Sequence, residues 1–77
     1  MKIFVTLQLT FEHLAPEGRN PFAVELPAGS TVSQALEALS IPASAPKVII
    51  VNGRAAVPGK ELSDGDRLTL FSPVAGG

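Results

Sequence analysis

The segment that decides the fold of this chain is TVSQALEAL, residues 31–39. Thr31 and Gln34 have the spacing of a capping box, in which the threonine hydroxyl accepts from an early backbone N–H and the glutamine reaches back. Apolar residues follow at helical spacing on one face: Val32, Ala35, Leu36 and Leu39. The segment therefore predicts one amphipathic helix, which must cover an apolar surface supplied by the rest of the chain.

Two strands are predicted before this helix. Residues 2–10 and residues 22–26 alternate between apolar and polar positions, as half-buried strands do. Residues 12–21 between them have the composition of a loop, with four turn-forming residues: Pro16, Gly18, Asn20 and Pro21. Consecutive strands joined by a loop favour an antiparallel pair.

Two more strands are predicted directly after the helix, which Pro42 and Pro46 are expected to end. Residues 47–51, KVIIV, form a β-branched run that suits a strand covered on both faces. Asn52-Gly53 favours a tight hairpin turn, because both residues tolerate a positive φ. A short return strand over residues 54–57 follows from that turn.

The last strand is predicted over residues 67–71, after a turn at residues 62–66, LSDGD. Leu68 and Leu70 would point inward, and the other three residues outward. The order of elements indicates an α+β fold, a mixed sheet of four to five strands crossed by one main helix. A right-handed crossover through the helix would place the first and last strands side by side.

Composition excludes several classes of function. The 77 residues make one small domain, and the absence of Cys excludes disulfides and thiolate chemistry. Six Lys and Arg stand against seven Asp and Glu without a basic run, which argues against nucleic acid or an anionic membrane as partner. No apolar stretch approaches the roughly 20 residues of a spanning helix. A cytoplasmic protein is expected.

Little in the chain indicates catalysis. His13 is the one histidine, and a metal site needs several convergent ligands. Asp64 and Asp66 flank Gly65 and fit a solvated turn better than a catalytic carboxylate pair. No Gly-x-Ser-x-Gly motif or phosphate-binding loop is present. The chain is therefore predicted to be neither an enzyme nor a holder of a metal or cofactor.

The last residues carry the most specific functional signal. Gly76 and Gly77 have no side chains, and Pro73-Val74 favours an extended approach to them. Such an end can enter a narrow channel and present the α-carboxylate of Gly77 for activation. An ordinary frayed terminus is the alternative interpretation.

Four motifs together resemble the MoaD/ThiS family of ubiquitin-like sulfur carriers over nearly the whole chain: Thr31-Val32, Val51-Asn52-Gly53, residues 62–66 and FSPVAGG, residues 71–77. The last motif is the most similar to MoaD, the small subunit of molybdopterin synthase. The resemblance implies a β-grasp domain over residues 1–71 and a flexible Gly-Gly tail over residues 72–77.

The resemblance also implies a function. A MoeB/ThiF-type enzyme would use ATP to adenylate Gly77, which would then become a thiocarboxylate, and the slim Gly76 would permit entry. The thiocarboxylate would donate sulfur inside a MoaE-like large subunit during molybdopterin (molybdenum or tungsten cofactor) biosynthesis. At most the chain would be the small subunit of a molybdopterin synthase.

A docking surface is predicted on the outward face of the sheet. If the first and last strands are adjacent and parallel, as in a β-grasp sheet, Phe4 and Phe71 share that face, beside the root of the tail. Exposed aromatic residues commonly anchor interfaces. Further predicted partner-binding residues are Arg67, Pro73 and Val74, with Thr6 and Thr69 around the aromatic pair.

Three alternatives remain open from the sequence. A ThiS-like carrier would deliver sulfur to thiazole synthase for thiamine. A ubiquitin-like modifier would attach Gly77 to lysines of target proteins. A binding module would have an inert tail.

Overall fold

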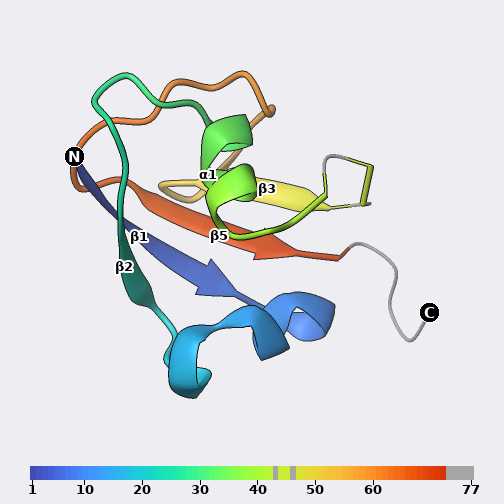
Figure 1. Ribbon diagram of the computed structural model, residues 1–77. Helices are drawn as coiled ribbons and strands as arrows, with labels where there is room; N and C mark the ends of the chain where they lie inside the picture. Colours follow the sequence, from blue (N-terminus) through green and yellow to red (C-terminus); the bar gives the residue numbers. More distant parts are fainter. Residues whose placement is uncertain (43, 46, 73–77) are drawn as a thin grey trace.

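The computed structural model describes residues 1–42, 44–45 and 47–72. These residues form a five-stranded sheet, and the α-helix at residues 32–38 packs across one of its faces (Figure 1). The elements in chain order are β1 (Lys2–Leu7), the 3-10 helices η1 (Leu9–Leu14) and η2 (Pro16–Gly18), β2 (Phe22–Glu25), α1 (Val32–Ala38), β3 (Val48–Val51), β4 (Arg54–Ala55) and β5 (Arg67–Phe71). The described residues thus form the predicted α+β architecture.

The sheet has the strand order β2-β1-β5-β3-β4. β1 pairs with β2 in antiparallel fashion and with β5 in parallel fashion, and β3 is antiparallel to both β5 and β4. The predicted adjacency of the first and last strands is therefore confirmed. β5 lies at the centre of the sheet, between β1 and β3, and Phe71 is its last residue.

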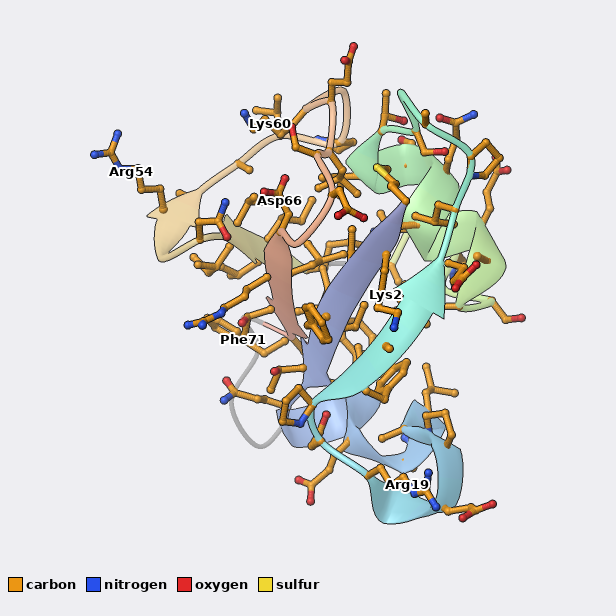
Figure 2. The ribbon with its side chains drawn as sticks, turned by 90° about the vertical axis from the view of Figure 1, so that its left-hand side faces the viewer. Lys2, Arg19, Arg54, Lys60, Asp66 and Phe71 are labelled. Atoms are coloured by element: carbon orange, nitrogen blue, oxygen red, sulfur yellow. The ribbon has the colours of Figure 1, made fainter. Side chains whose placement is uncertain are left out.

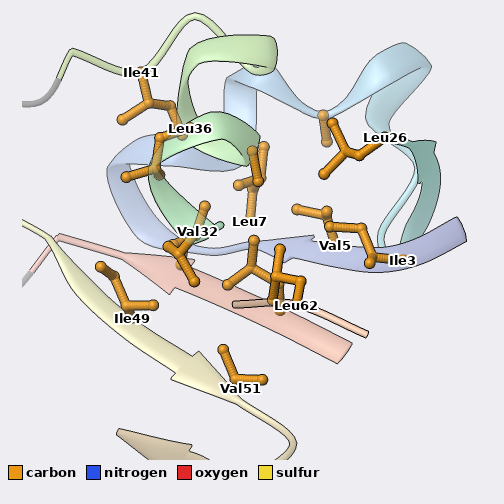
Figure 3. Packing of buried hydrophobic residues seen from close by; sticks show 14 residues of the cluster. Ile3, Val5, Leu7, Leu26, Val32, Leu36, Ile41, Ile49, Val51 and Leu62 are labelled. Atoms are coloured by element: carbon orange, nitrogen blue, oxygen red, sulfur yellow. The ribbon is translucent and has the colours of Figure 1, made fainter. Parts of the chain in front are cut away.

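The core lies between the sheet and α1 (Figure 3). The predicted inward residues of β1 and β5, Ile3, Val5, Leu7, Leu68 and Leu70, are all completely buried. Val32, Ala35 and Leu36 of α1 close over them, as the helical spacing predicts. On β3 the burial alternates, because Ile49 and Val51 are buried while Val48 and Ile50 are half-buried.

The helix begins at the predicted N-cap, but it ends through a C-terminal capping motif rather than at a proline. Thr31 is the N-cap, and the capping box with Gln34 is complete in both directions. At the other end Ser40 takes a positive φ of 60°, and the Ile41 N–H donates to the Leu36 carbonyl at 2.9 Å. This is the Schellman arrangement, so the helix has already ended before Pro42, which was expected to stop it.

The prediction for the first strand and the following loop needs correction. β1 ends at Leu7 rather than at residue 10, and much of the predicted loop at residues 12–21 lies in η1 and η2. Beyond Leu7 the chain has no neighbouring strand on the β2 side, and its last bond to β5 is from the Gln8 N–H to the Leu70 carbonyl. The backbone N–H groups of the next residues then donate to carbonyls three residues earlier in the chain, as in a 3-10 helix.

Asn20 completes the edge of β1, a role that its turn-like context did not predict. The Leu7 N–H donates to Asn20 Oδ1 at 2.9 Å, and Asn20 Nδ2 donates to the Leu7 carbonyl at 2.5 Å. The side-chain amide therefore replaces the strand residue that β2 does not supply opposite Leu7. It keeps two backbone groups at the end of a buried strand hydrogen-bonded.

Candidate functional site

The candidate site is the sheet face that α1 does not cover, together with the end of β5. Alternation along the strands places Phe4 and Thr6 of β1 and Arg67, Thr69 and Phe71 of β5 on this outer face, as predicted. Figure 2 shows Phe71 at the end of β5. Phe4 is 39% exposed and Phe71 is half-buried, and neither belongs to the hydrophobic core.

The two aromatic residues share a face but do not form the predicted pair beside the tail. Phe4 lies opposite Arg67 at the start of β5, whereas Phe71 lies opposite Val48. Four residues of strand separate their levels, which is about 13 Å at roughly 3.3 Å per residue. Thr6 and Thr69 lie opposite each other in the register, at a level between those of Phe4 and Phe71.

The outer face is hollowed on both sides of Arg67. One hollow, of about 460 Å³, is lined by Phe4, Thr6, Pro21, Gly65, Arg67 and Thr69. A second, of about 410 Å³, is lined by Ile50, Asn52, Gly53, Arg67 and Thr69. Ile50, which sequence reasoning did not place on this surface, lies opposite Thr69 and extends the face to β3. Arg67 is exposed, and no carboxylate of the described residues forms an ion pair with it.

A turn tied by two aspartates holds the start of β5 in place. Asp64 Oδ1 accepts from the Lys2 N–H at 2.7 Å. Asp66 accepts from the Ser63 N–H at 2.8 Å and from Asn52 Nδ2 at 2.9 Å, and Asn52 Oδ1 in turn accepts from the Arg67 N–H at 2.9 Å. The two carboxylates therefore have structural partners, which agrees with the predicted turn.

This turn predicts a pH dependence of stability. The Ser63 N–H and then the Asn52 amide stabilise the ionised carboxylate, so the pKa of Asp66 lies below its ordinary value of 3.8. Because the folded-state pKa is depressed, the stabilisation is complete above the unfolded-state pKa and is lost as pH falls through the folded-state value. Urea unfolding of the wild type and of Asp66→Asn should show that the variant loses less stability than the wild type as pH falls below about 3.9.

Asn52→Ala tests whether these hydrogen bonds lower the pKa of Asp66, since it removes the second of the two. Its stability should depend on pH less than that of the wild type in the same range. Equal pH slopes for the wild type and both variants would contradict this account of the turn.

The end of β5 is held on both sides. The Gln8 N–H donates to the Leu70 carbonyl at 3.0 Å, and Phe71 is paired with Val48 of β3. η1 also contacts β5 near this end (Figure 1). The other predicted site residues, Pro73, Val74, Gly76 and Gly77, lie outside the described residues, as does the predicted tail apart from Ser72.

The described residues contain no cluster of three His, Cys, Asp or Glu side chains that could hold a metal ion. His13 is exposed in η1, which agrees with its interpretation as a surface residue. Within residues 1–42, 44–45 and 47–72, no helix has the length and apolar character needed to cross a membrane.

Comparisons with known protein families and solved structures identify proteins that are similar to this chain. The sequence profile of the ThiS family matches residues 8–77. A protein assigned as molybdopterin converting factor subunit 1 from Pyrococcus furiosus is 30% identical over 95% of this chain and 98% of its own, with a TM-score of 0.77. SAMP1 from Haloferax volcanii is 26% identical over 100% of both chains, with a TM-score of 0.79.

A further match shares the fold alone. A chain from the complex of subunits 1 and 2 of molybdopterin-converting factor of Helicobacter pylori is 18% identical over 100% of both chains, with a TM-score of 0.67. No curated protein matches the sequence. The solved structures confirm a ubiquitin-like β-grasp fold for this chain.

Proposed function

Since the chain belongs to the ThiS family, we propose that it carries sulfur as a thiocarboxylate on Gly77. The observation that carries this proposal is the extent of the family match, which runs from residue 8 through residue 77 and so includes Gly76 and Gly77. The fold also supports the proposal, because it holds the strand that precedes the last residues in place. β5 is paired with β1 up to Leu70 and with β3 up to Phe71. The domain would serve as the handle, and the last residues as the reactive end.

The proposed chemistry needs a partner for every step. The Gly77 carboxylate attacks the α-phosphate of ATP in a MoeB/ThiF-type enzyme, which releases pyrophosphate and leaves an acyl adenylate. A sulfide equivalent then attacks the acyl carbon, and AMP leaves with the original oxygen. The chain itself supplies the carboxylate and a shape that fits the partner, and it requires no bound cofactor.

We propose molybdopterin biosynthesis as the pathway, with a MoaE-like large subunit as the acceptor. The support is the relative from Pyrococcus furiosus, whose assignment is to molybdopterin converting factor and which matches at 30% identity along almost the whole chain. A ThiS-like role toward thiazole synthase uses the same activation chemistry. The protein that co-purifies with the tagged chain, MoaE-like or thiazole-synthase-like, distinguishes the two pathways.

A second candidate function is protein modification. The observation that favours it is the match to SAMP1, since a solved structure of the same Haloferax volcanii protein calls it small archaeal modifier protein 1. In this role the Gly77 adenylate would react with a lysine amine and form an isopeptide bond. Recovery of lysine adducts from cells would support it.

The intact mass of the protein tests the main proposal. The purified chain is incubated with ATP, a sulfide source and a cognate adenylating enzyme, beside a carrier of known activity. A mass increase equal to the exchange of one oxygen for one sulfur, located on the C-terminal peptide, is the expected result. An unchanged mass while the control carrier reacts would contradict the proposal and favour an inert tail.

Substitution of Gly76 should slow this activation. A bulky residue such as Leu adds a side chain where the partner's channel is expected to admit only backbone, so we expect Gly76→Leu to lower the rate of adenylate formation at least tenfold. Pyrophosphate release measures this rate. Gly59→Leu is the control, because Gly59 has open space around it and does not have a positive φ. Equal rates for both variants would contradict the narrow channel.

Phe71 is proposed to anchor a partner on the outer face, with Arg67, Pro73, Val74 and, at the far end, Phe4. Phe71→Ala should weaken association with the large subunit about tenfold or more, because a buried aromatic anchor often contributes 2 kcal/mol or more to binding. Calorimetric titration measures the affinity. The thermal unfolding midpoint should change little, since Phe71 lies outside the core.

Phe22→Ala is the matched control for Phe71→Ala. Phe22 is also an aromatic strand residue, but it packs against the core from β2. Its substitution should lower the unfolding midpoint and, in the protein that remains folded, leave partner affinity near the wild-type value. A loss of stability in Phe71→Ala as large as in Phe22→Ala would show that Phe71 supports the fold rather than a partner.

A further inference from the structure

A hollow of about 610 Å³ beside β4 is not used by the proposed function. Val51, Ala56 and Val57 contribute apolar surface to it, and Arg54 and Lys60 contribute positive charge. It lies at the β3–β4 hairpin, and Val51 is level with Leu68 at the start of β5, whereas Phe71 is level with Val48 at the other end. The hollow is therefore distant from the strand end that carries Phe71 and the last residues.

The segment that forms one wall of the hollow is held in a defined position. The Pro58 carbonyl accepts from the Ser33 N–H at 2.8 Å, and the Lys60 carbonyl accepts from the Val32 N–H at 2.9 Å. These N–H groups belong to the first turn of α1, where a helix has no partners of its own for them. Val57 is thus fixed to the domain although its side chain is 66% exposed, which reduces the entropy lost when a ligand binds.

The lining of the hollow carries positive charge in a chain whose net charge is −1. Arg54 and Lys60 are the charged residues that line the hollow, and none of its lining residues is Asp or Glu. Neither Arg54 nor Lys60 forms an ion pair with a described residue. Asp66, whose pKa Lys60 helps to lower, already accepts hydrogen bonds from Ser63 and Asn52. Figure 2 shows Arg54 and Lys60 projecting from the same end of the molecule, remote from Arg19.

We propose that this hollow binds an acidic segment of a partner protein in which carboxylates flank an aliphatic side chain. The aliphatic side chain would pack on Val57 and Ala56, and the carboxylates would lie near Arg54 and Lys60. Apolar contact and charge complementarity both contribute to the affinity, and the two cations select negative charge on either side of the aliphatic side chain. Because this surface is separate from Phe71, a partner bound here leaves the end of β5 free to contact another protein. The inference stands independently of the sulfur-carrier proposal.

A blocked peptide, acetyl-Asp-Glu-Leu-Glu-Asp-amide, tests the proposal by NMR titration of the full chain. Amide shifts should change most within residues 51–60, and the affinity should fall as salt is raised, since exposed ion pairs are screened. The double variant Arg54→Glu/Lys60→Glu should bind at least tenfold more weakly, and Val57→Ser several-fold more weakly. All the altered side chains are exposed, so the thermal unfolding midpoint should stay near that of the wild type.

Two controls make the result decisive. Arg19→Glu reverses an exposed cation remote from Arg54 and Lys60 (Figure 2) and should leave peptide affinity nearly unchanged. The amide peptide acetyl-Asn-Gln-Leu-Gln-Asn-amide should bind at least tenfold more weakly than the acidic one. The proposal is overturned if shifts cluster around Phe4 and Arg67, if both peptides bind equally, or if the double variant binds as the wild type does. Binding to phosphatidylserine–phosphatidylcholine vesicles without binding to the peptide would also overturn it.

Discussion

Removal of Gly77 is expected to lower thiocarboxylate formation by more than about 100-fold while the free energy of unfolding stays the same. Deletion moves the terminal carboxylate back by one residue, about 3.5 Å along an extended chain. A displacement of even about 1 Å from the reacting phosphate can reduce a rate by roughly 100-fold. The rate of pyrophosphate release and the intact mass, measured with the same adenylating enzyme and sulfide source, give the result.

The unfolding measurement separates chemistry from folding in this experiment. Among the described residues, every buried core residue lies between Ile3 and Leu70, so we expect the deletion of Gly77 to leave the core intact. A variant with one alanine added after Gly77 should fail in the same way, because it moves the carboxylate in the opposite direction. If the deletion variant gained sulfur at the wild-type rate, Gly77 would not be the reactive residue.

Leu68→Ala is expected to have the largest effect on stability. Leu68 is completely buried in the central strand β5, with β1 on one side and β3 on the other. Truncation of such a leucine leaves a cavity and typically costs about 2–5 kcal/mol of unfolding free energy. In a domain of this size, each kcal/mol lowers the unfolding midpoint by roughly 4–8 °C. Urea and thermal unfolding measure the change.

Leu14→Ala is the matched control, because it makes the same substitution at a residue that is 37% exposed in η1. Its unfolding free energy should change by about 0.5 kcal/mol or less. Equal losses in the two variants would contradict the placement of Leu68 at the centre of the core. Below its lowered midpoint, Leu68→Ala should still accept sulfur on Gly77, because the reactive group does not depend on the core.

The two surfaces proposed for partners differ in their chemistry. The outer face combines aromatic and aliphatic residues with Arg67 and continues toward the last residues, which suits an enzyme that must grip the domain and reach Gly77. The hollow beside β4 carries Arg54 and Lys60 around exposed Val57 and lies at the other end of β3. The two proposals together would give this chain of 77 residues two docking surfaces of distinct chemistry.

Local patterns in the sequence were sufficient for most of the fold. The capping box at Thr31 and Gln34, the alternation of β1 and β5 and the hairpin turn at Asn52-Gly53 each depend on residues close together in the chain. Their physical causes, hydrogen bonds to neighbouring backbone and burial of one face, act over a few residues. For the same reason the Gly-Gly motif and the family resemblance were visible without coordinates.

Only the tertiary structure decided the features that depend on distant partners. β2 begins at Phe22, opposite Val5, so it supplies no partner for Leu7, and Asn20 takes the place of the missing strand residue. Phe4 and Phe71 are separated along the sheet because the register places Phe4 opposite Arg67. The hollow beside β4 exists because the loop carrying Val57 is bonded to the first turn of α1. Strand length, register and the docking of a loop are set by contacts between remote segments, which periodicity within one segment does not encode.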